Sequence, residues 1–145
     1  MASLVDTNIL IYCFDPRHAH KRESARRLLR EGRARDALFI PHQAIVEFVS
    51  VVTRVLPHGH SLLPREEAWR QAEDLLAVFP VLYPDAAVVR TALRGMAAYQ
   101  LSWFDAHLWA YADRYGLPEI LSEDFEHGRM YGSVRVINPF LRPAR

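Results

Sequence analysis

Two acidic residues follow short apolar runs along the chain. Asp6 comes directly after residues 3–5, and Asp124 lies in the acidic segment that follows residues 119–122. If both runs are parallel strands, the two carboxylates lie at the same edge of the sheet, where α/β proteins bind ligands. An acidic segment after a strand is also typical of a solvated turn, and its position beside Asp6 is what favours a functional role for Asp124.

Two further acids, Glu47 and Asp105, belong to segments with the features of helices. Glu47 is the only charged residue in the apolar stretch 44–52, and a buried carboxylate must face a cleft, pair with a cation or bind a metal ion. Asp105 follows Ser102 at the spacing of a capping box. A metal-binding acid in a first helical turn has the same spacing, so the cap and the metal ligand are compatible interpretations.

The chemistry open to these four carboxylates follows from their charge. Carboxylates that converge in one cleft repel each other, and the repulsion raises their proton affinity unless a cation is bound. Oxygen ligands suit hard divalent ions such as Mg²⁺ or Mn²⁺. Such ions serve phosphate chemistry, because they activate a water and neutralise phosphoryl oxygens. The four acids therefore predict metal-dependent hydrolysis of a phosphodiester or a phosphomonoester.

The elements that must position these acids follow from hydrophobic spacing and from helix and turn signals. Strands alternate with helices, which predicts a mainly parallel sheet of about five strands, covered on both faces, in a single α/β domain over residues 1–145. Asp85 and Ser102 are expected to cap helices, whereas Thr7 and Asn8 are helix N-cap types that open a helical turn. The predicted strands are 3–5, 37–40, 81–83, 119–122 and 134–137, and the predicted helices are 9–14, 18–32, 42–55, 64–79, 85–99 and 102–115.

Composition narrows the class of protein further. With 145 residues, of which 50% are hydrophobic and 24% charged, the chain can bury a core and is not disordered. Its net charge of +1 gives no overall bias towards a polyanionic partner. Cys13 is the only cysteine, which excludes an internal disulfide and is typical of a reducing compartment. No uncharged run approaches the length of about 18 residues that a membrane helix needs, so we expect a cytoplasmic protein.

Taken in order, these motifs resemble those of the PIN domain family, and within it the VapC-type toxin ribonucleases of toxin–antitoxin pairs. The resemblance extends from residue 3 to residue 140 and includes the ending 125–140. Its strength lies in the ordered set, because each motif alone is weak. The matching segments are Val5-Asp6-Thr7-Asn8-Ile9-Leu10, Glu47 in its apolar helix, Ser102-x-x-Asp105-Ala106 and Leu121-Ser122-Glu123-Asp124.

The resemblance implies a three-layer αβα fold, Mg²⁺ or Mn²⁺ as cofactor, and RNA as substrate. It also implies a homodimer, inhibited by a small antitoxin protein that binds beside the active site. By motif, the acidic quartet would be Asp6, Glu47, Asp105 and Asp124, supported by Thr7, Asn8 and Ser102. Some relatives carry two acids at the fourth motif; Glu126 could fill the second place here, and Glu123 competes with it locally.

A basic stretch over residues 21–35 offers a second link to RNA. Its arginines, Arg22 and Arg26 among them, could contact phosphates. The same arginines, with Glu23, Glu31 and Asp36 interleaved, are also typical of a solvated helix face. Both interpretations stay open from the sequence.

The function that we predict from the sequence is a metal-dependent endoribonuclease. A water oriented by the acids would attack the phosphorus in line, leaving a 5′ phosphate and a 3′ hydroxyl. One alternative is a phosphomonoesterase with an aspartyl nucleophile, which normally needs a second acid where Asn8 stands. The other is a catalytically inert module that binds RNA or an antitoxin, against which the presence of all four acids argues.

Overall fold

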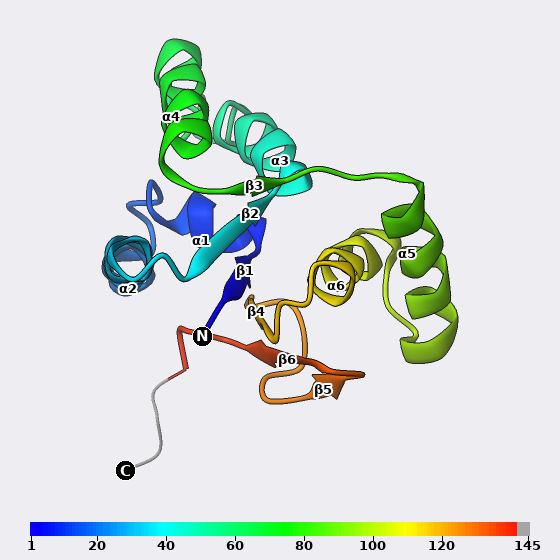
Figure 1. Ribbon diagram of the computed structural model, residues 1–145. Coiled ribbons are helices and arrows are strands. Elements are labelled where there is room, and N and C mark those ends of the chain that lie inside the picture. The colour runs from blue at the N-terminus through cyan, green and yellow to red at the C-terminus, as the bar shows by residue number, and fades with distance from the viewer. Residues whose placement is uncertain (142–145) are drawn as a thin grey trace.

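The computed structural model describes residues 1–141. Its centre is one six-stranded sheet with the strand order β3-β2-β1-β4-β6-β5, in which only β5 runs antiparallel to its neighbour (Figure 1). The strands are β1 (Ser3–Val5), β2 (Leu38–Pro41), β3 (Val81–Leu82), β4 (Glu119–Leu121), β5 (Met130–Tyr131) and β6 (Val134–Ile137). The helices are α1 (Thr7–Tyr12), α2 (Ala19–Ala34), α3 (His42–Val52), α4 (Arg65–Val78), α5 (Ala86–Tyr99) and α6 (Trp103–Arg114).

The helices form a layer on each side of the sheet (Figure 1). Along β1, Leu4 belongs to the apolar core shared with α5 and α6, and Val5 belongs to the core shared with α1 to α4. This division follows from the alternation of side chains along a strand. The predicted three-layer α/β fold with a mainly parallel sheet is therefore confirmed.

The sixth strand, β5, is the main difference from the predicted sheet. Met130 and Tyr131 pair with β6 across a tight turn in which Gly132 has a φ of +63°. A strand of two residues carries no readable alternation, and its pairing depends on the hairpin rather than on its own composition. This strand also supports α6, because Trp109 Nε1 donates a hydrogen bond of 2.9 Å to the carbonyl oxygen of Tyr131.

Several helix boundaries differ from those predicted; the helix expected over residues 42–55, for example, ends at Val52. Two of the differences have a clear physical cause. The helix that was expected to begin at Ile9 begins at Thr7, because Asp6 is its N-cap and accepts a hydrogen bond from the Thr7 amide. The helix expected to end at Gly32 continues to Ala34. Gly32 is needed for packing instead, since a Cβ atom there would lie 2.5 Å from the Leu38 side chain on β2. The predicted caps at Asp85 and Ser102 are confirmed.

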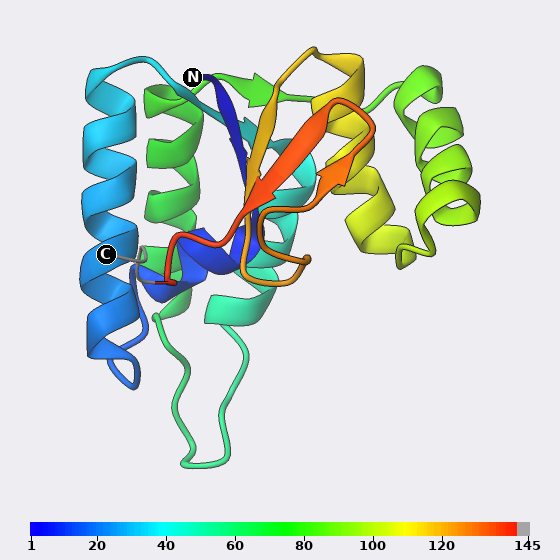
Figure 2. The same ribbon diagram turned by 90° about the horizontal axis from the view of Figure 1, so that it is seen from below.

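The sheet also determines where the ends of the elements lie. Figure 2 shows β1 and β4 ending at the same edge, close to the first turns of α1 and α2. The first turn of α6 lies towards the same end of the molecule (Figure 2). Within residues 1–141, no helix is long and apolar enough to span a bilayer.

Candidate active site at the carboxyl edge of the sheet

Asp6 lies at the junction between the central strand β1 and helix α1. Its amide donates a hydrogen bond of 3.0 Å to the carbonyl oxygen of Leu121 on β4. Its Oδ1 atom accepts a hydrogen bond of 2.6 Å from the amide of Thr7. The residue is only 3% exposed. The strand pairing and the helix cap together hold the Asp6 carboxylate in one orientation.

Ser122, which follows β4 directly, joins Asp6 to Asp124. Its hydroxyl donates a hydrogen bond of 2.6 Å to Oδ2 of Asp6 and accepts one of 3.0 Å from the amide of Asp124. Ser122 is fully buried and is absent from the set of site residues predicted from sequence. The signal that could have indicated it is its position at the carboxyl end of a strand parallel to β1.

Glu47 reaches this edge from the middle of α3. Thr7 Oγ1 donates a hydrogen bond of 3.1 Å to its Oε2 atom, and Gln43 Nε2 donates one of 2.9 Å to its Oε1 atom. Gln43 Nε2 also lies 3.2 Å from the carbonyl oxygen of Phe104, so it links α3 to the start of α6. Gln43 was not predicted either, although it precedes Glu47 by four residues and shares its helix face.

Asp105 lies in the first turn of α6 and is half-buried. Its amide donates a hydrogen bond of 3.1 Å to Oγ of Ser102, which caps the helix. Ser102 itself is exposed, and among residues 1–141 its side chain makes no hydrogen bond to another acid of the site. Ser102 therefore contributes as the N-cap of α6, which places Asp105 in the first turn of that helix.

The carboxylates of the site influence one another electrostatically. The pKa of Asp6 is raised to about 7: burial is the main cause, the charges of Asp124 and Asp105 add to it, and the hydrogen bonds from Ser122 and Thr7 oppose it. Burial also raises the pKa of Asp105, followed by the charges of Asp124 and Glu47. Burial and acidic neighbours therefore disfavour the ionised forms of Asp6 and Asp105. A nearby cation would remove that penalty.

The donor set suits a hard divalent cation. All of the converging side chains present oxygen atoms, which Mg²⁺ and Mn²⁺ prefer. Asn8 Nδ2 lies 3.4 Å from Oδ2 of Asp6, while its Oδ1 atom is buried without a hydrogen-bond partner. Within residues 1–141, no three acidic, histidine or cysteine side chains already stand at metal-binding distances from one another.

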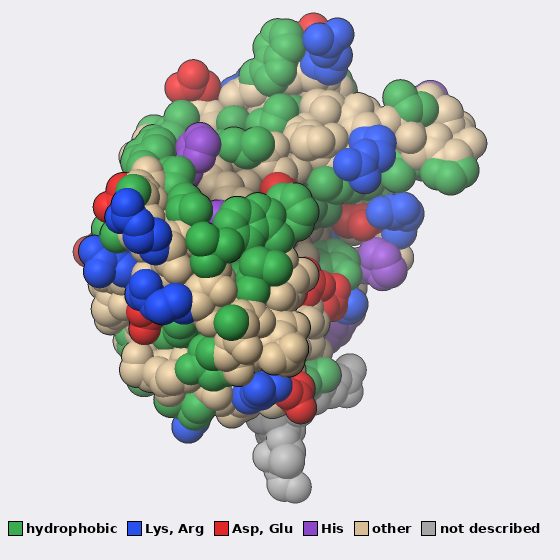
Figure 3. All heavy atoms as spheres, turned by 90° about the vertical axis from the view of Figure 1, so that its right-hand side faces the viewer, with side chains coloured by type: hydrophobic (Ala, Val, Ile, Leu, Met, Phe, Trp, Pro, Cys, Tyr) green, Lys and Arg blue, Asp and Glu red, His purple; other side chains and the backbone are tan. Residues whose placement is uncertain are grey.

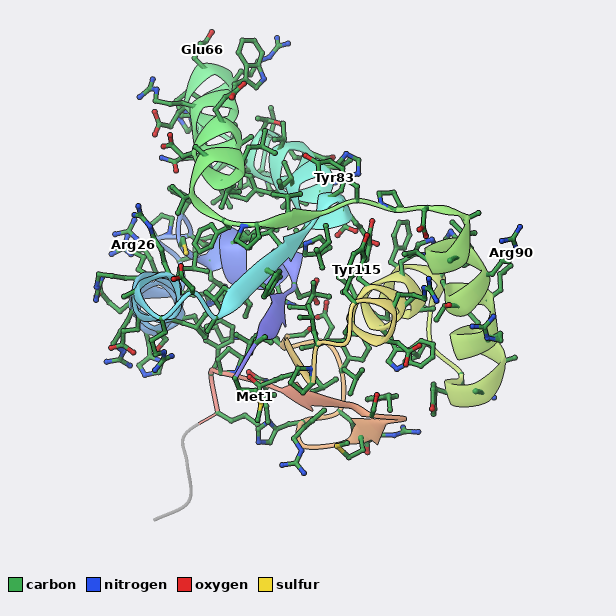
Figure 4. The ribbon with its side chains drawn as sticks, viewed as in Figure 1. Met1, Arg26, Glu66, Tyr83, Arg90 and Tyr115 are labelled. Atoms are coloured by element: carbon green, nitrogen blue, oxygen red, sulfur yellow. The ribbon has the colours of Figure 1, made fainter. Side chains whose placement is uncertain are left out.

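The remaining predicted residues are not joined to the quartet. Glu123 pairs with Lys21 and Tyr12, and Glu126 forms an exposed ion pair with Arg129. Nε of Arg26 donates to the carbonyl oxygen of Cys13, and the side chain projects from α2 on the side of α4 (Figure 4). Nε of Arg22 is buried without a partner among the described residues. Both arginines belong to the first half of α2, which begins beside the site edge (Figure 2).

Comparison with known proteins identifies the family. The family description "PIN domain" matches residues 3–132, so the chain belongs to the PIN domain family. The resemblance inferred from the ordered acidic motifs is thereby confirmed. A search of curated proteins gave no match.

Solved structures with the same fold include several toxins of toxin–antitoxin complexes. A toxin–antitoxin complex from Klebsiella pneumoniae has a chain with a TM-score of 0.68 and 18% identity, covering 95% of this chain and 98% of that one. The sarcin-ricin loop cleaving toxin VapC20 from Mycobacterium tuberculosis has a TM-score of 0.64 and 17% identity, covering 85% and 90%. VapBC2 from Rickettsia felis, bound to a DNA fragment from its promoter, gives 0.69 and 11%, covering 94% and 97%. At these identities the likeness concerns the fold.

Proposed function

We propose that this protein is a metal-dependent endoribonuclease that acts in the cytoplasm as the toxin of a toxin–antitoxin pair. The observation that carries the proposal is the convergence of Asp6, Glu47, Asp105 and Asp124 on one edge of the sheet, where burial and mutual repulsion raise the pKa of Asp6 to about 7. Such a cluster is costly without a cation. Its presence in a PIN domain supports metal-assisted cleavage of a phosphodiester.

The chain's own residues would perform distinct parts of the reaction. The four carboxylates would hold Mg²⁺ or Mn²⁺, which, when bound, lowers the pKa of water and offsets the charge of the phosphoryl oxygens. Ser122 and Thr7 hold Asp6 by hydrogen bonds, and Thr7 and Gln43 hold Glu47.

Asp124 is the exposed member of the quartet and would face the incoming RNA. A water oriented by these acids attacks the phosphorus in line and passes a proton to a carboxylate. The bond to the 3′ oxygen breaks, and that oxygen takes up a proton from solvent, which leaves a 5′ phosphate and a 3′ hydroxyl.

An experiment in cells tests both the chemistry and the toxin role. The wild-type chain is expressed in a tester strain, and RNA 5′ ends are sequenced beside those from an Asp124→Asn variant. Growth arrest and new 5′-phosphate ends are expected with wild type only. Asp113→Asn is the matched control, because Asp113 is an exposed acid in the last turn of α6. New ends with Asp124→Asn at the wild-type level would contradict the proposal.

Co-expression in the same cells tests whether a small antitoxin protein inhibits this chain. An apolar pocket of about 250 Å³ lies between α1, α2, α3 and α4, with Leu10, Leu29 and Leu75 in its lining. It could accept an apolar side chain of a small partner, and similar folds occur in toxin–antitoxin complexes. Co-expression of a small protein encoded beside this one is expected to relieve the arrest. Persistent arrest would count against the toxin role and leave the nuclease untouched.

A homodimer is supported by an apolar face that includes parts of α3, α5 and α6. Figure 3 shows hydrophobic side chains gathered on the α5 side of the molecule, with acidic side chains to their right. Val46, Leu93 and Phe104 are 54%, 54% and 63% exposed, and exposed apolar side chains that gather in one patch are typical of a protein–protein interface. Two copies of this face would form an interface beside the acidic site.

The dimer has its own test. Leu93→Asp is expected to convert the protein from dimer to monomer in sedimentation velocity, because a charge would be buried in the interface. The control is Leu76→Asp, which places the same charge at a leucine of α4 that is 46% exposed. A monomeric wild type, or a Leu93→Asp protein that remains dimeric, would show that this face is not the interface.

A further inference from the structure

Three side chains from separate elements form a closed polar cluster next to Asp124. Lys21 Nζ, from α2, lies 2.6 Å from Oε2 of Glu123. Tyr12, the last residue of α1, donates its hydroxyl to the other carboxylate oxygen of Glu123 at 2.5 Å. Lys21 Nζ also lies 3.3 Å from the Tyr12 hydroxyl. We call Tyr12, Lys21 and Glu123 the lysine cluster.

The lysine cluster is shielded from solvent on one side by aromatic rings. The ring of Phe140 meets that of Tyr12 edge to face at 5.1 Å, and the side chains of Lys21 and Glu123 are 34% and 25% exposed. Burial alone would raise the pKa of Glu123, but the hydrogen bonds from Lys21 and Tyr12 outweigh it and lower this pKa. Both carboxylate oxygens of Glu123 are therefore engaged, and neither is free to bind a metal ion.

The position of Asp124 depends on the two residues before it. Ser122 is tied to Asp6 at the start of α1, and Glu123 is tied to Tyr12 at the end of α1 and to Lys21 on α2. Among residues 1–141, no side chain donates a hydrogen bond to the Asp124 carboxylate. The position of the Asp124 carboxylate is therefore set by its backbone, which the side-chain hydrogen bonds of Ser122 and Glu123 hold in place.

We propose that Lys21 and Glu123 are positioning residues that hold the backbone of Asp124 beside Asp6, so that both carboxylates can bind the same divalent cation. This inference rests on the proposed function, because it assumes that the acidic quartet binds the cation. It assigns one basic residue of α2 to the organisation of the site rather than to the RNA backbone. It also assigns Glu123 to the lysine cluster instead of the metal.

For the Lys21→Met variant, a positioning role and a purely electrostatic role predict opposite changes in cation affinity. Lys21→Met removes a positive charge near an anionic site, and charge alone would strengthen cation binding. Glu123→Gln removes a negative charge, and charge alone would weaken it. If the pair acts by positioning, both variants bind the cation more weakly, by about tenfold, the low end for groups that orient metal ligands. The double variant is then expected to bind the cation no more weakly than either single variant, because each substitution removes the same Lys21–Glu123 ion pair.

The experiment measures Mn²⁺ binding to the full chain directly, by electron paramagnetic resonance of the free ion. Lys21→Arg keeps the ion pair and is expected to restore affinity to within about threefold of wild type. Tyr12→Phe removes one hydrogen bond from Glu123 and is expected to have a smaller effect than Lys21→Met. Arg70→Met and Glu67→Gln disrupt an ion pair of 2.7 Å on α4 and are expected to change nothing. Circular dichroism verifies that each variant is folded.

The outcomes separate this inference from the proposed function. Weaker binding by both single variants, without further loss in the double variant, supports the positioning role. Tighter binding by Lys21→Met, or unchanged binding by both variants, overturns it while leaving the nuclease intact. A wild-type chain that binds no Mn²⁺ and cleaves no RNA would remove the proposed function, and this inference with it.

Discussion

Purified Asp6→Asn protein is expected to cleave RNA at least about 10³-fold more slowly than wild type at saturating Mg²⁺, a loss of about 4 kcal/mol of transition-state stabilisation. Asparagine can still cap α1 and accept the hydrogen bond from Thr7. The fold should therefore be preserved while the buried negative charge is lost. Initial rates on a single-stranded RNA, measured across a range of Mg²⁺ concentrations, check this expectation.

The control for this prediction is Asp113→Asn, which makes the same change at an exposed acid of α6. It is expected to cleave at the wild-type rate. Full activity of Asp6→Asn at matched metal concentrations would show that Asp6 does not take part in the chemistry. Release of phosphate from small phosphoesters by wild type, without RNA cleavage, would instead favour the phosphomonoesterase.

The same substitution is expected to stabilise the metal-free protein at pH 8. The pKa of Asp6 is about 7 in the folded chain, compared with 3.8 for a free side chain. Below about pH 4 the carboxyl group is protonated in both states and costs nothing. As the pH rises towards 7, the unfolded chain releases this proton more readily than the folded chain, so stability falls. The full difference corresponds to about 4 kcal/mol at 1.4 kcal/mol per pKa unit.

Thermal unfolding in the presence of a chelator measures this effect. At pH 8 Asp6→Asn is expected to unfold roughly 8–16 °C above wild type, since 1 kcal/mol shifts the Tm of a domain of this size by about 2–4 °C. The difference should disappear near pH 4. Adding Mg²⁺ should raise the Tm of wild type more than that of the variant, because only the folded wild type holds the complete acidic site. Equal Tm values at pH 8 would contradict the raised pKa.

A stabilising substitution that abolishes activity would identify the site by its energetics as well as by its geometry. Replacing a residue of the hydrophobic core destabilises the protein. A residue that binds a ligand often lowers the stability of the ligand-free protein, so replacing it can stabilise the fold. Asp6 is expected to belong to the second class. The core residue Leu4, immediately before the Val5-Asp6 pair and fully buried, would belong to the first.

The sequence predicted the α6 region more completely than the β5–β6 hairpin that follows it. The Ser102 cap and the helix after it are local features, set by a hydroxyl and an amide three residues apart. The hairpin of β5 and β6 is also local, but its signal is confined to two residues and a glycine with positive φ. The long helix α2 was placed correctly except at its end, where packing of Gly32 against Leu38 overrides the usual role of glycine as a helix terminator.

By itself, the sequence determined the alternation of strands and helices, and with it the edge on which Asp6 and Asp124 lie. That follows from local periodicity, since parallel strands bring their carboxyl ends to one side. Only the tertiary structure decided which neighbours those acids have. Ser122 and Asp6 are 116 residues apart, and Lys21 and Glu123 are 102 apart. Such pairings depend on strand order and on the angle of α2, which no local pattern records. Glu123 and Asp124, adjacent in sequence, therefore have different partners: Glu123 joins the lysine cluster, and Asp124 joins the acidic quartet.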